Sequence, residues 1–279
     1  MGYTDSPTGT DPVGLAAVSV MSIALYNVLE LNVIIFSFFK RKSGLYFWSF
    51  FLATWGIVFH TVSHLTWNLG FLTNGPAWVT IAVIGWVPMV TCQSLVLYSR
   101  LHLIVHDQKI LRPVLVMIIT NVFIGHVPAI IIAYGSVVSL NPEPYIIGYS
   151  VYEKIQVSLF FLQEVIISSL YIWHTYRALH VWKAIHGTRV YKMLRHLVLV
   201  NVVIIILDVS VLVLEYNSLY NMQTAIKGMA YSIKLKVEYT VLNSLINLTK
   251  ANIGRSNSHG TSISGLQSHN EFAVREPSS

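Results

Sequence analysis

Seven apolar runs follow one another along the chain, each close to the length that an α-helix needs to cross a bilayer. About twenty helical residues cover the roughly 30 Å of hydrocarbon. Backbone polar groups find no water there, so each segment must satisfy its own hydrogen bonds as a helix. The runs are Gly14–Phe39, Tyr46–Leu69, Ala77–Ser99, Pro113–Tyr134, Ile155–Tyr176, His196–Tyr216 and Ala225–Leu248. The sequence therefore predicts an all-α protein, a bundle of seven transmembrane helices.

The composition favours a membrane protein and argues against a nucleic-acid partner. Charged residues make up 11% of the chain and hydrophobic residues 54%, whereas about a quarter of the residues in a soluble domain are charged. The net charge is +6, but the basic residues stand in short loops between apolar runs and form no basic stripe. The lipid bilayer is the expected partner, in the plasma membrane or the endoplasmic reticulum.

The charges of the loops predict the orientation of the chain. Fourteen of the eighteen Lys and Arg residues fall on one side of the predicted bundle. They are Lys40, Arg41, Lys42, Arg100, Lys109, Arg112, Arg177, Lys183, Arg189, Lys192, Arg195, Lys250, Arg255 and Arg275. Near the other side lie only Lys154 and Lys227. Because cytoplasmic loops are rich in Lys and Arg, the N-terminus is predicted outside and the C-terminus in the cytoplasm.

This topology divides the chain into three parts. Residues 1–13 form a polar extracellular or luminal N-terminus, and residues 14–248 form the seven-helix domain. Residues 249–279 are rich in Ser, Asn, Gly and His without apolar periodicity, so we expect a disordered cytoplasmic tail. The glycosylation sequon at Asn247 lies on the predicted cytoplasmic side and should stay unmodified.

The seventh run carries charges where a transmembrane helix is normally apolar. Its segment "YSIKLKVEYT" contains Lys234, Lys236 and Glu238. A charge at the centre of a span costs about 2.5–3.5 kcal/mol on insertion scales. Lys234 and Glu238 share a helical face, whereas Lys236 points elsewhere and must reach the interface, another helix or a cavity.

Acidic residues of the sixth run match two of these lysines. Consecutive spans are antiparallel, so facing residues have position numbers with a constant sum. Asp208 with Lys234 and Glu215 with Lys227 give the same sum, and the two pairs would lie about 10 Å apart. Charges in lipid usually survive by pairing. The sequence therefore predicts two structural ion pairs between the sixth and seventh runs.

Further polar side chains fall at a similar depth in other runs. They are Glu30, His60, His64, His126, Gln163 and Glu164. They predict a polar centre, which is either a hydrogen-bonded network that fixes helix packing or a ligand or catalytic pocket. His60 and His64 stand one helical turn apart and could hold zinc with a carboxylate. The spacing specifies no third ligand, so a packing role is preferred and neither a metal nor a cofactor is predicted.

Tyr98-Ser99-Arg100 ends the third run at its predicted cytoplasmic side. G-protein-coupled receptors have an arginine at a comparable place, but the chain lacks their Asn-Pro-x-x-Tyr motif and has only one cysteine, Cys92. We therefore interpret the segment as an interfacial tyrosine followed by a loop arginine.

Three segments together resemble a known family. The segments "LYSRLHLI", "EKIQVSLFFLQEVIISSLYIW" and "YSIKLKVEYTVLNSLINL" resemble an uncharacterised family of fungal seven-helix integral membrane proteins, a domain of unknown function. The resemblance covers nearly the whole chain except its two ends. The resemblance implies a fungal origin and a multi-pass membrane fold. Members of this family are sometimes compared with fungal receptor-like proteins. Small multi-pass proteins of this kind can accompany gene clusters of secondary metabolism.

The preferred functional hypothesis is a receptor-like or sensor protein without enzymatic activity. A small or lipophilic ligand would enter the bundle, where the candidate ligand-binding residues are His60, His64, His126, Gln163 and Glu164. The basic third and fifth loops would face a cytoplasmic partner.

The alternative hypothesis is an intramembrane enzyme, such as a terpene-cyclase-like protein associated with fungal secondary metabolism. Such chemistry needs a carboxylic acid that an apolar site keeps protonated. Glu30 and Glu164 are the candidate catalytic acids because neither has a basic partner in register. A proton-coupled transporter is a further alternative, although no inverted repeat relates the two halves of the chain.

Overall fold

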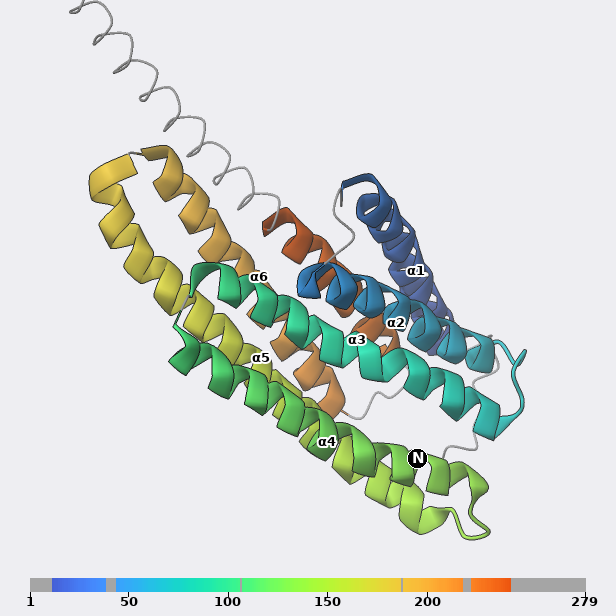
Figure 1. Cartoon of the computed structure of the whole chain (residues 1–279). Coiled ribbons are helices and arrows are strands. Elements are labelled where there is room, and N and C mark those ends of the chain that lie inside the picture. Colours follow the sequence, from blue (N-terminus) through green and yellow to red (C-terminus); the bar gives the residue numbers. More distant parts are fainter. Residues whose placement is uncertain (1–11, 39–43, 106, 187, 218–221, 242–279) are drawn as a thin grey trace, which may run out of the picture. The chain divides into compact units, whose positions relative to one another are not determined.

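The computed structural model describes residues 12–38, 44–105, 107–186, 188–217 and 222–241, where all regular structure is α-helical. The first six helices are α1 (Pro12–Phe38), α2 (Leu45–Asn68), α3 (Gly75–Ile104), α4 (Gln108–Val138), α5 (Glu143–His186) and α6 (Thr188–Tyr216). A further helix, residues 222–241, follows α6 and is the unlabelled orange-red helix of Figure 1. The prediction of an all-α protein is confirmed.

The helices differ in how well they suit a membrane. Within the described ranges, α1 to α6 are each long and apolar enough to cross a bilayer. Residues 222–241 carry Lys227, Lys234, Lys236 and Glu238 and are not among these six spans. The protein is therefore a multi-pass helical bundle, and the seventh span and the orientation of the termini stay predictions.

Capping side chains, rather than the edges of apolar runs, decide where α3 and α4 begin. The side chain of Asn74 accepts a hydrogen bond from the backbone N–H of Ala77 at 3.2 Å. Asp107 accepts one from the backbone N–H of Lys109 at 2.9 Å. Such caps satisfy N–H groups that the first turn of a helix leaves without partners. α4 therefore begins at Gln108, ahead of the predicted run that starts at Pro113.

Consecutive helices pack against one another, and α3 also packs against α5. The backbones of α2 and α3 come closest at two glycines. A Cβ atom added at Gly56 would lie 2.6 Å from the backbone nitrogen of Met89 and 2.8 Å from the carbonyl oxygen of Gly85. Small residues allow this close approach of helix backbones, which is a common way of packing helices in membranes.

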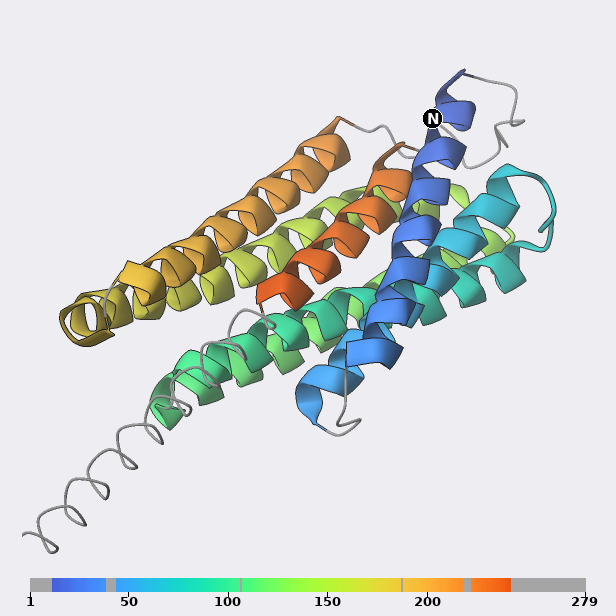
Figure 2. The same ribbon diagram turned by 90° about the horizontal axis from the view of Figure 1, so that it is seen from above.

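The 222–241 helix is the last described helix of the chain, and it contacts five of the six earlier helices. Residues 222–238 of this helix belong to the same compact unit as α1 to α6. Figure 2 shows the helix between α1 and α6. Its contacts with α1, α2, α3, α5 and α6 are Ser232 with Asn27, Gly228 with Thr61, Glu238 with Arg100, Lys234 with Glu164, and Lys227 with Glu215.

Candidate functional site: a charged cavity inside the bundle

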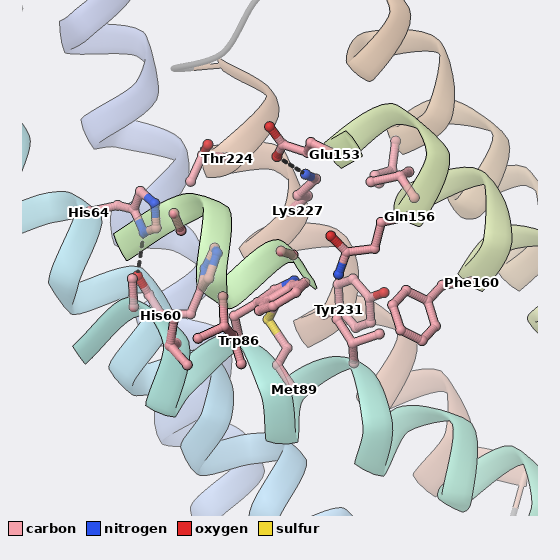
Figure 3. Close-up of a pocket in the computed structure, with 18 of the residues that line it drawn as sticks. His60, His64, Trp86, Met89, Glu153, Gln156, Phe160, Thr224, Lys227 and Tyr231 are labelled. Atoms are coloured by element: carbon pink, nitrogen blue, oxygen red, sulfur yellow. Dashed lines mark hydrogen bonds and ion pairs between the residues drawn. The ribbon is translucent and has the colours of Figure 1, made fainter. Parts of the chain in front are cut away.

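A cavity of about 100 Å³ lies among α2, α3, α4, α5, α6 and the 222–241 helix (Figure 3). Its lining combines charged and aromatic side chains. The charged residues are Glu153, Glu164, Asp208, Lys227 and Lys234, and the aromatic residues with six-membered rings are Trp78, Trp86, Tyr149, Phe160, Phe161 and Tyr231. A small volume with several charges of both signs is unusual for a membrane interior, where an ionised group is costly.

Lys234 forms the centre of the first charged group, which we call the Lys234 cluster (Lys234, Glu164 and Asp208). Its Nζ donates to Oε2 of Glu164 at 2.8 Å and also contacts Oδ1 of Asp208. The ammonium lies 4.4 Å from the centroid of the Tyr231 ring, a cation–π distance. The side chain of Lys234 is only 1% exposed. The ammonium therefore meets two carboxylates in a buried place.

Lys227 forms the centre of the second group, the Lys227 cluster (Lys227, Glu153 and Glu215). Its Nζ lies 2.8 Å from Oε1 of Glu153 and 3.0 Å from Oε2 of Glu215. The side-chain amide of Gln223 donates to both glutamates. Lys154 acts electrostatically on Glu215, so a second positive charge lies close to this cluster. Figure 3 shows the contact between Lys227 and Glu153.

Arg100 forms the third group, the Arg100 cluster (Arg100, Glu238, Asn201 and Tyr171). Nη1 lies 2.8 Å from Oε2 of Glu238, and Nη2 donates to Oδ1 of Asn201 at 2.6 Å. The guanidinium carbon lies 4.5 Å from the centroid of the Tyr171 ring. Arg100 is fully buried. The interpretation of Arg100 as a loop arginine is therefore wrong, because α3 continues to Ile104 and carries it inside the bundle.

The three clusters follow from helical spacing on the 222–241 helix. Lys227, Lys234 and Glu238 stand at i, i+7 and i+11, so their side chains leave the same face of the helix. At about 1.5 Å of rise per residue, the clusters lie roughly 10 Å and 6 Å apart along the axis. The structure places both lysines against the acidic residues with which the antiparallel register pairs them, Asp208 and Glu215.

The expectation that Glu30 and Glu164 lack basic partners is wrong. Glu164 contacts Lys234, as described above. Glu30 contacts Lys236, whose Nζ also donates to Oδ1 of Asn27 at 2.6 Å. The antiparallel register relates only consecutive spans, here the sixth and seventh runs. α5 and α1 also pack against the 222–241 helix, and they supply the carboxylates of Glu164 and Glu30.

The two neighbouring histidines of α2 lie at the wall of the cavity. Their rings are 4.6 Å apart between centroids. The Nδ1 of His64 hydrogen-bonds the backbone carbonyl of His60 at 2.9 Å, which Figure 3 shows as a dashed line. The His64 ring also meets the edge of Trp78. Among the described residues, no three His, Cys, Asp or Glu side chains gather in a way that could hold a metal ion.

His126 and Gln163 lie behind the cavity wall. The His126 ring packs between Trp86 and Phe160, at centroid distances of 4.5 Å and 5.0 Å. The side-chain amide of Gln163 donates to the hydroxyl of Ser94 at 2.8 Å. The structure therefore brings three of the five candidate ligand-binding residues, His60, His64 and Glu164, to the cavity surface. His126 packs against two lining residues, whereas Gln163 bonds Ser94, which does not line the cavity.

The N-terminal half of α5 contributes lining residues that the sequence did not predict, Glu153, Gln156 and Phe160. Glu153, Gln156, Phe160 and Glu164 stand at i, i+3, i+7 and i+11 and line one side of the cavity. This spacing is a readable signal of a shared helical face. It was overlooked because the predicted run began at Ile155, whereas α5 begins at Glu143 and places Glu153 well inside the helix.

A helical bundle with six membrane-length apolar helices and buried charges is a multi-pass integral membrane protein. The chain belongs to the DUF7703 family, described as a domain of unknown function, which matches residues 9–260. No curated protein and no solved structure matches the chain significantly. The family supports the resemblance to a family of unknown function, and the function has to be argued from the site.

Proposed function

We propose that the protein is a receptor-like membrane protein that binds a small ligand in the cavity of its bundle. The observation that carries this proposal is a set of buried polar atoms at the cavity that have no hydrogen-bond partner within the described part of the chain. They are Nδ1 of His60, Nε2 of Gln156, Oε1 of Glu164 and Oδ2 of Asp208.

Such atoms support a binding site where they border a cavity, because a ligand can reach them there. A buried polar atom without a partner costs about 1–3 kcal/mol, and a network that only fixes packing is best when every member is satisfied. Here donors and acceptors line one cavity from α2, α5 and α6. A polar ligand, with or without water, would supply the missing partners.

The geometry supports binding better than acid catalysis. The terpene-cyclase-like hypothesis needs Glu30 or Glu164 as a protonated acid. Each contacts a lysine ammonium, and a nearby positive charge favours the ionised carboxylate. The size of the cavity also limits the ligand. A cavity of about 150 Å³ holds benzene, so about 100 Å³ accommodates a small molecule rather than a large lipophilic one.

The test is ligand-dependent unfolding of the purified protein in lipid nanodiscs. We expect that at least one class among small amines, carboxylates and neutral alcohols raises the unfolding temperature, because a ligand at 100 times its Kd stabilises by about 2.7 kcal/mol. Ala129→Leu fills part of the cavity and should remove the effect. Ala17→Leu is the matched control, since Ala17 is equally buried but packs against Met21 and Ala225. Stabilisation by none of the classes, or equal stabilisation in Ala129→Leu, would refute ligand binding in the cavity.

A receptor also needs a defined orientation, and we propose that the N-terminus lies outside and the C-terminus in the cytoplasm. The distribution of Lys and Arg supports this orientation. In this orientation residues 177–195, Lys109 and Arg112 face the cytoplasm, where a partner protein could bind them. Thr8 and Asn247 lie outside the described residues. A glycosylation acceptor engineered at Thr8 should be modified and Asn247 should not, and modification of Asn247 would overturn the orientation.

A further inference from the structure

We infer that the ligand of the cavity is a small organic cation, an amine or a quaternary ammonium, which binds at Glu164 and Asp208. This inference rests on the proposed function and deepens it by naming the class of ligand. Its basis is the unequal charge of the Lys234 cluster, the position of its free oxygen atoms and the aromatic lining beside them.

With both carboxyl groups ionised, the Lys234 cluster has one negative charge in excess. Both Glu164 and Asp208 contact the ammonium of Lys234. The cations of the two neighbouring clusters have carboxylates of their own, Arg100 with Glu238 and Lys227 with Glu153 and Glu215. Within the described residues, no further Lys or Arg contacts either carboxylate of the cluster. A buried uncompensated charge is strongly unfavourable, so the cluster calls for one additional positive charge.

The free oxygen atoms of the cluster are available for that charge. Oε1 of Glu164 and Oδ2 of Asp208 have no hydrogen-bond partner among the described residues, and both residues line the cavity. Glu164 is 1% exposed and Asp208 is 7% exposed, so bulk solvent does not compensate them. A carboxylate accepts hydrogen bonds only. The cluster therefore selects a ligand that donates hydrogen bonds or carries a positive charge, and it repels an anion.

Aromatic rings favour an organic cation over a bare metal ion. Trp86, Phe160 and Tyr231 lie around the part of the cavity shown in Figure 3. Ring faces attract cations, and quaternary ammonium groups are typically recognised by aromatic cages. The rings of Trp86 and Phe160 offer no oxygen ligands, whereas hard metal ions take six or more oxygen ligands. The volume of the cavity, about 100 Å³, is also larger than the volume of a metal ion or a proton.

The experiment compares four probes on the full-length protein in nanodiscs at constant ionic strength: tetramethylammonium chloride, ethylamine hydrochloride, sodium chloride and tert-butanol. We expect the unfolding temperature to rise in a saturable way with an amine or ammonium, and to respond neither to sodium nor to the neutral alcohol of similar shape. Glu164→Gln should weaken the apparent affinity for the cation at least tenfold. Glu30→Gln is the matched control, because Glu30 contacts Lys236 and does not line the cavity, and it should bind as the wild type does.

The outcomes separate this inference from the proposed function. Saturable stabilisation by tert-butanol or acetate, but not by amines, would overturn the cation and leave ligand binding intact. A rise in stability on lowering the pH, lost in Glu164→Gln and without any response to amines, would show that a proton balances the charge and would also overturn it. If Glu164→Gln does not fold, the selectivity of the wild type among the four probes decides alone. Stabilisation by no compound class would refute the proposed function together with the inference.

Discussion

The Arg100 cluster and the Lys234 cluster stand on the same face of one helix, but their charges are matched in different ways. Arg100 meets one carboxylate, Glu238, and its other contacts are Asn201 and Tyr171. Lys234 meets two carboxylates and borders a cavity. The Arg100–Glu238 pair is balanced in charge, whereas a one-to-two group with both carboxylates ionised needs another positive charge. The difference indicates that one cluster holds the bundle together and the other serves a ligand.

The largest effect is expected at the balanced cluster. Arg100→Met leaves the carboxylate of Glu238 buried, and Glu238 does not line the cavity described above. Breaking a buried pair by removing one partner costs about 3–5 kcal/mol. We expect a loss of this size in the free energy of unfolding, measured by denaturant titration in micelles.

Two variants sharpen this measurement. Arg112→Met changes an exposed arginine of α4 and should cost within about 0.5 kcal/mol. The double variant Arg100→Met with Glu238→Gln should recover much of the loss, because it removes the uncompensated charge. A loss at Arg100 no greater than that at Arg112 would show that the cluster is not structural.

Lys234→Met should cost less than Arg100→Met, about 2–3 kcal/mol. It removes the only ammonium of its cluster, which is a large effect. However, Glu164 and Asp208 can then share a proton, as neighbouring carboxyl groups do, and the cavity admits water beside them. The same denaturant titration checks the order of the two variants. Equal losses would contradict the distinction between a sealed cluster and an open one.

Lys227→Met should cost about 1 kcal/mol. The Lys227 side chain is 10% exposed and that of Glu153 is 13% exposed, so this cluster lies closer to the surface than the other two, and pairs near the surface contribute little. Lys154 also remains close to Glu215. Thermal unfolding of Lys227→Met beside Lys234→Met measures the difference, and a loss as large as that of Lys234→Met would be inconsistent with it.

The smallest effect is expected for Asp208→Asn, under about 1 kcal/mol. Lys234 keeps Glu164 as a partner, and the excess negative charge disappears. Glu238→Gln is the corresponding change at the balanced cluster and should cost several times more, since it leaves Arg100 buried without its only carboxylate among the described residues. Comparable losses in the two variants would remove the basis for calling one cluster unbalanced.

Much of the fold could be predicted because membrane spans have a strong sequence signal. Lengths of about twenty apolar residues located α1 to α6, although the predicted runs miss the ends of the helices by up to twelve residues, at the start of α5. Those ends depend on local caps such as Asn74 and Asp107. α3 continues past Ser99, because an arginine inside the bundle is tolerated when a carboxylate and an amide meet it.

The site was less predictable because its contacts join helices that are distant in sequence. The antiparallel register of two consecutive spans gave the correct neighbours for Lys234 and Lys227. It could not give Glu164 or Glu153, because the packing of α5 against the 222–241 helix is a property of the whole bundle. Arg100 and Glu238 lie 138 positions apart in the chain, and no local pattern joins them.

The position of the 222–241 helix has a consequence for biogenesis. Ribosomes deliver chains from the N-terminus, so α1 to α6 leave the ribosome before this helix does. Until then, Glu153, Glu164 and Asp208 have none of the lysines that they contact in the finished bundle. The six earlier helices therefore carry buried carboxylates without their lysine partners until the 222–241 helix packs against them and supplies Lys227 and Lys234. Synthesis that stops before residue 222 would leave a protein that cellular quality control can recognise by its unpaired intramembrane carboxylates.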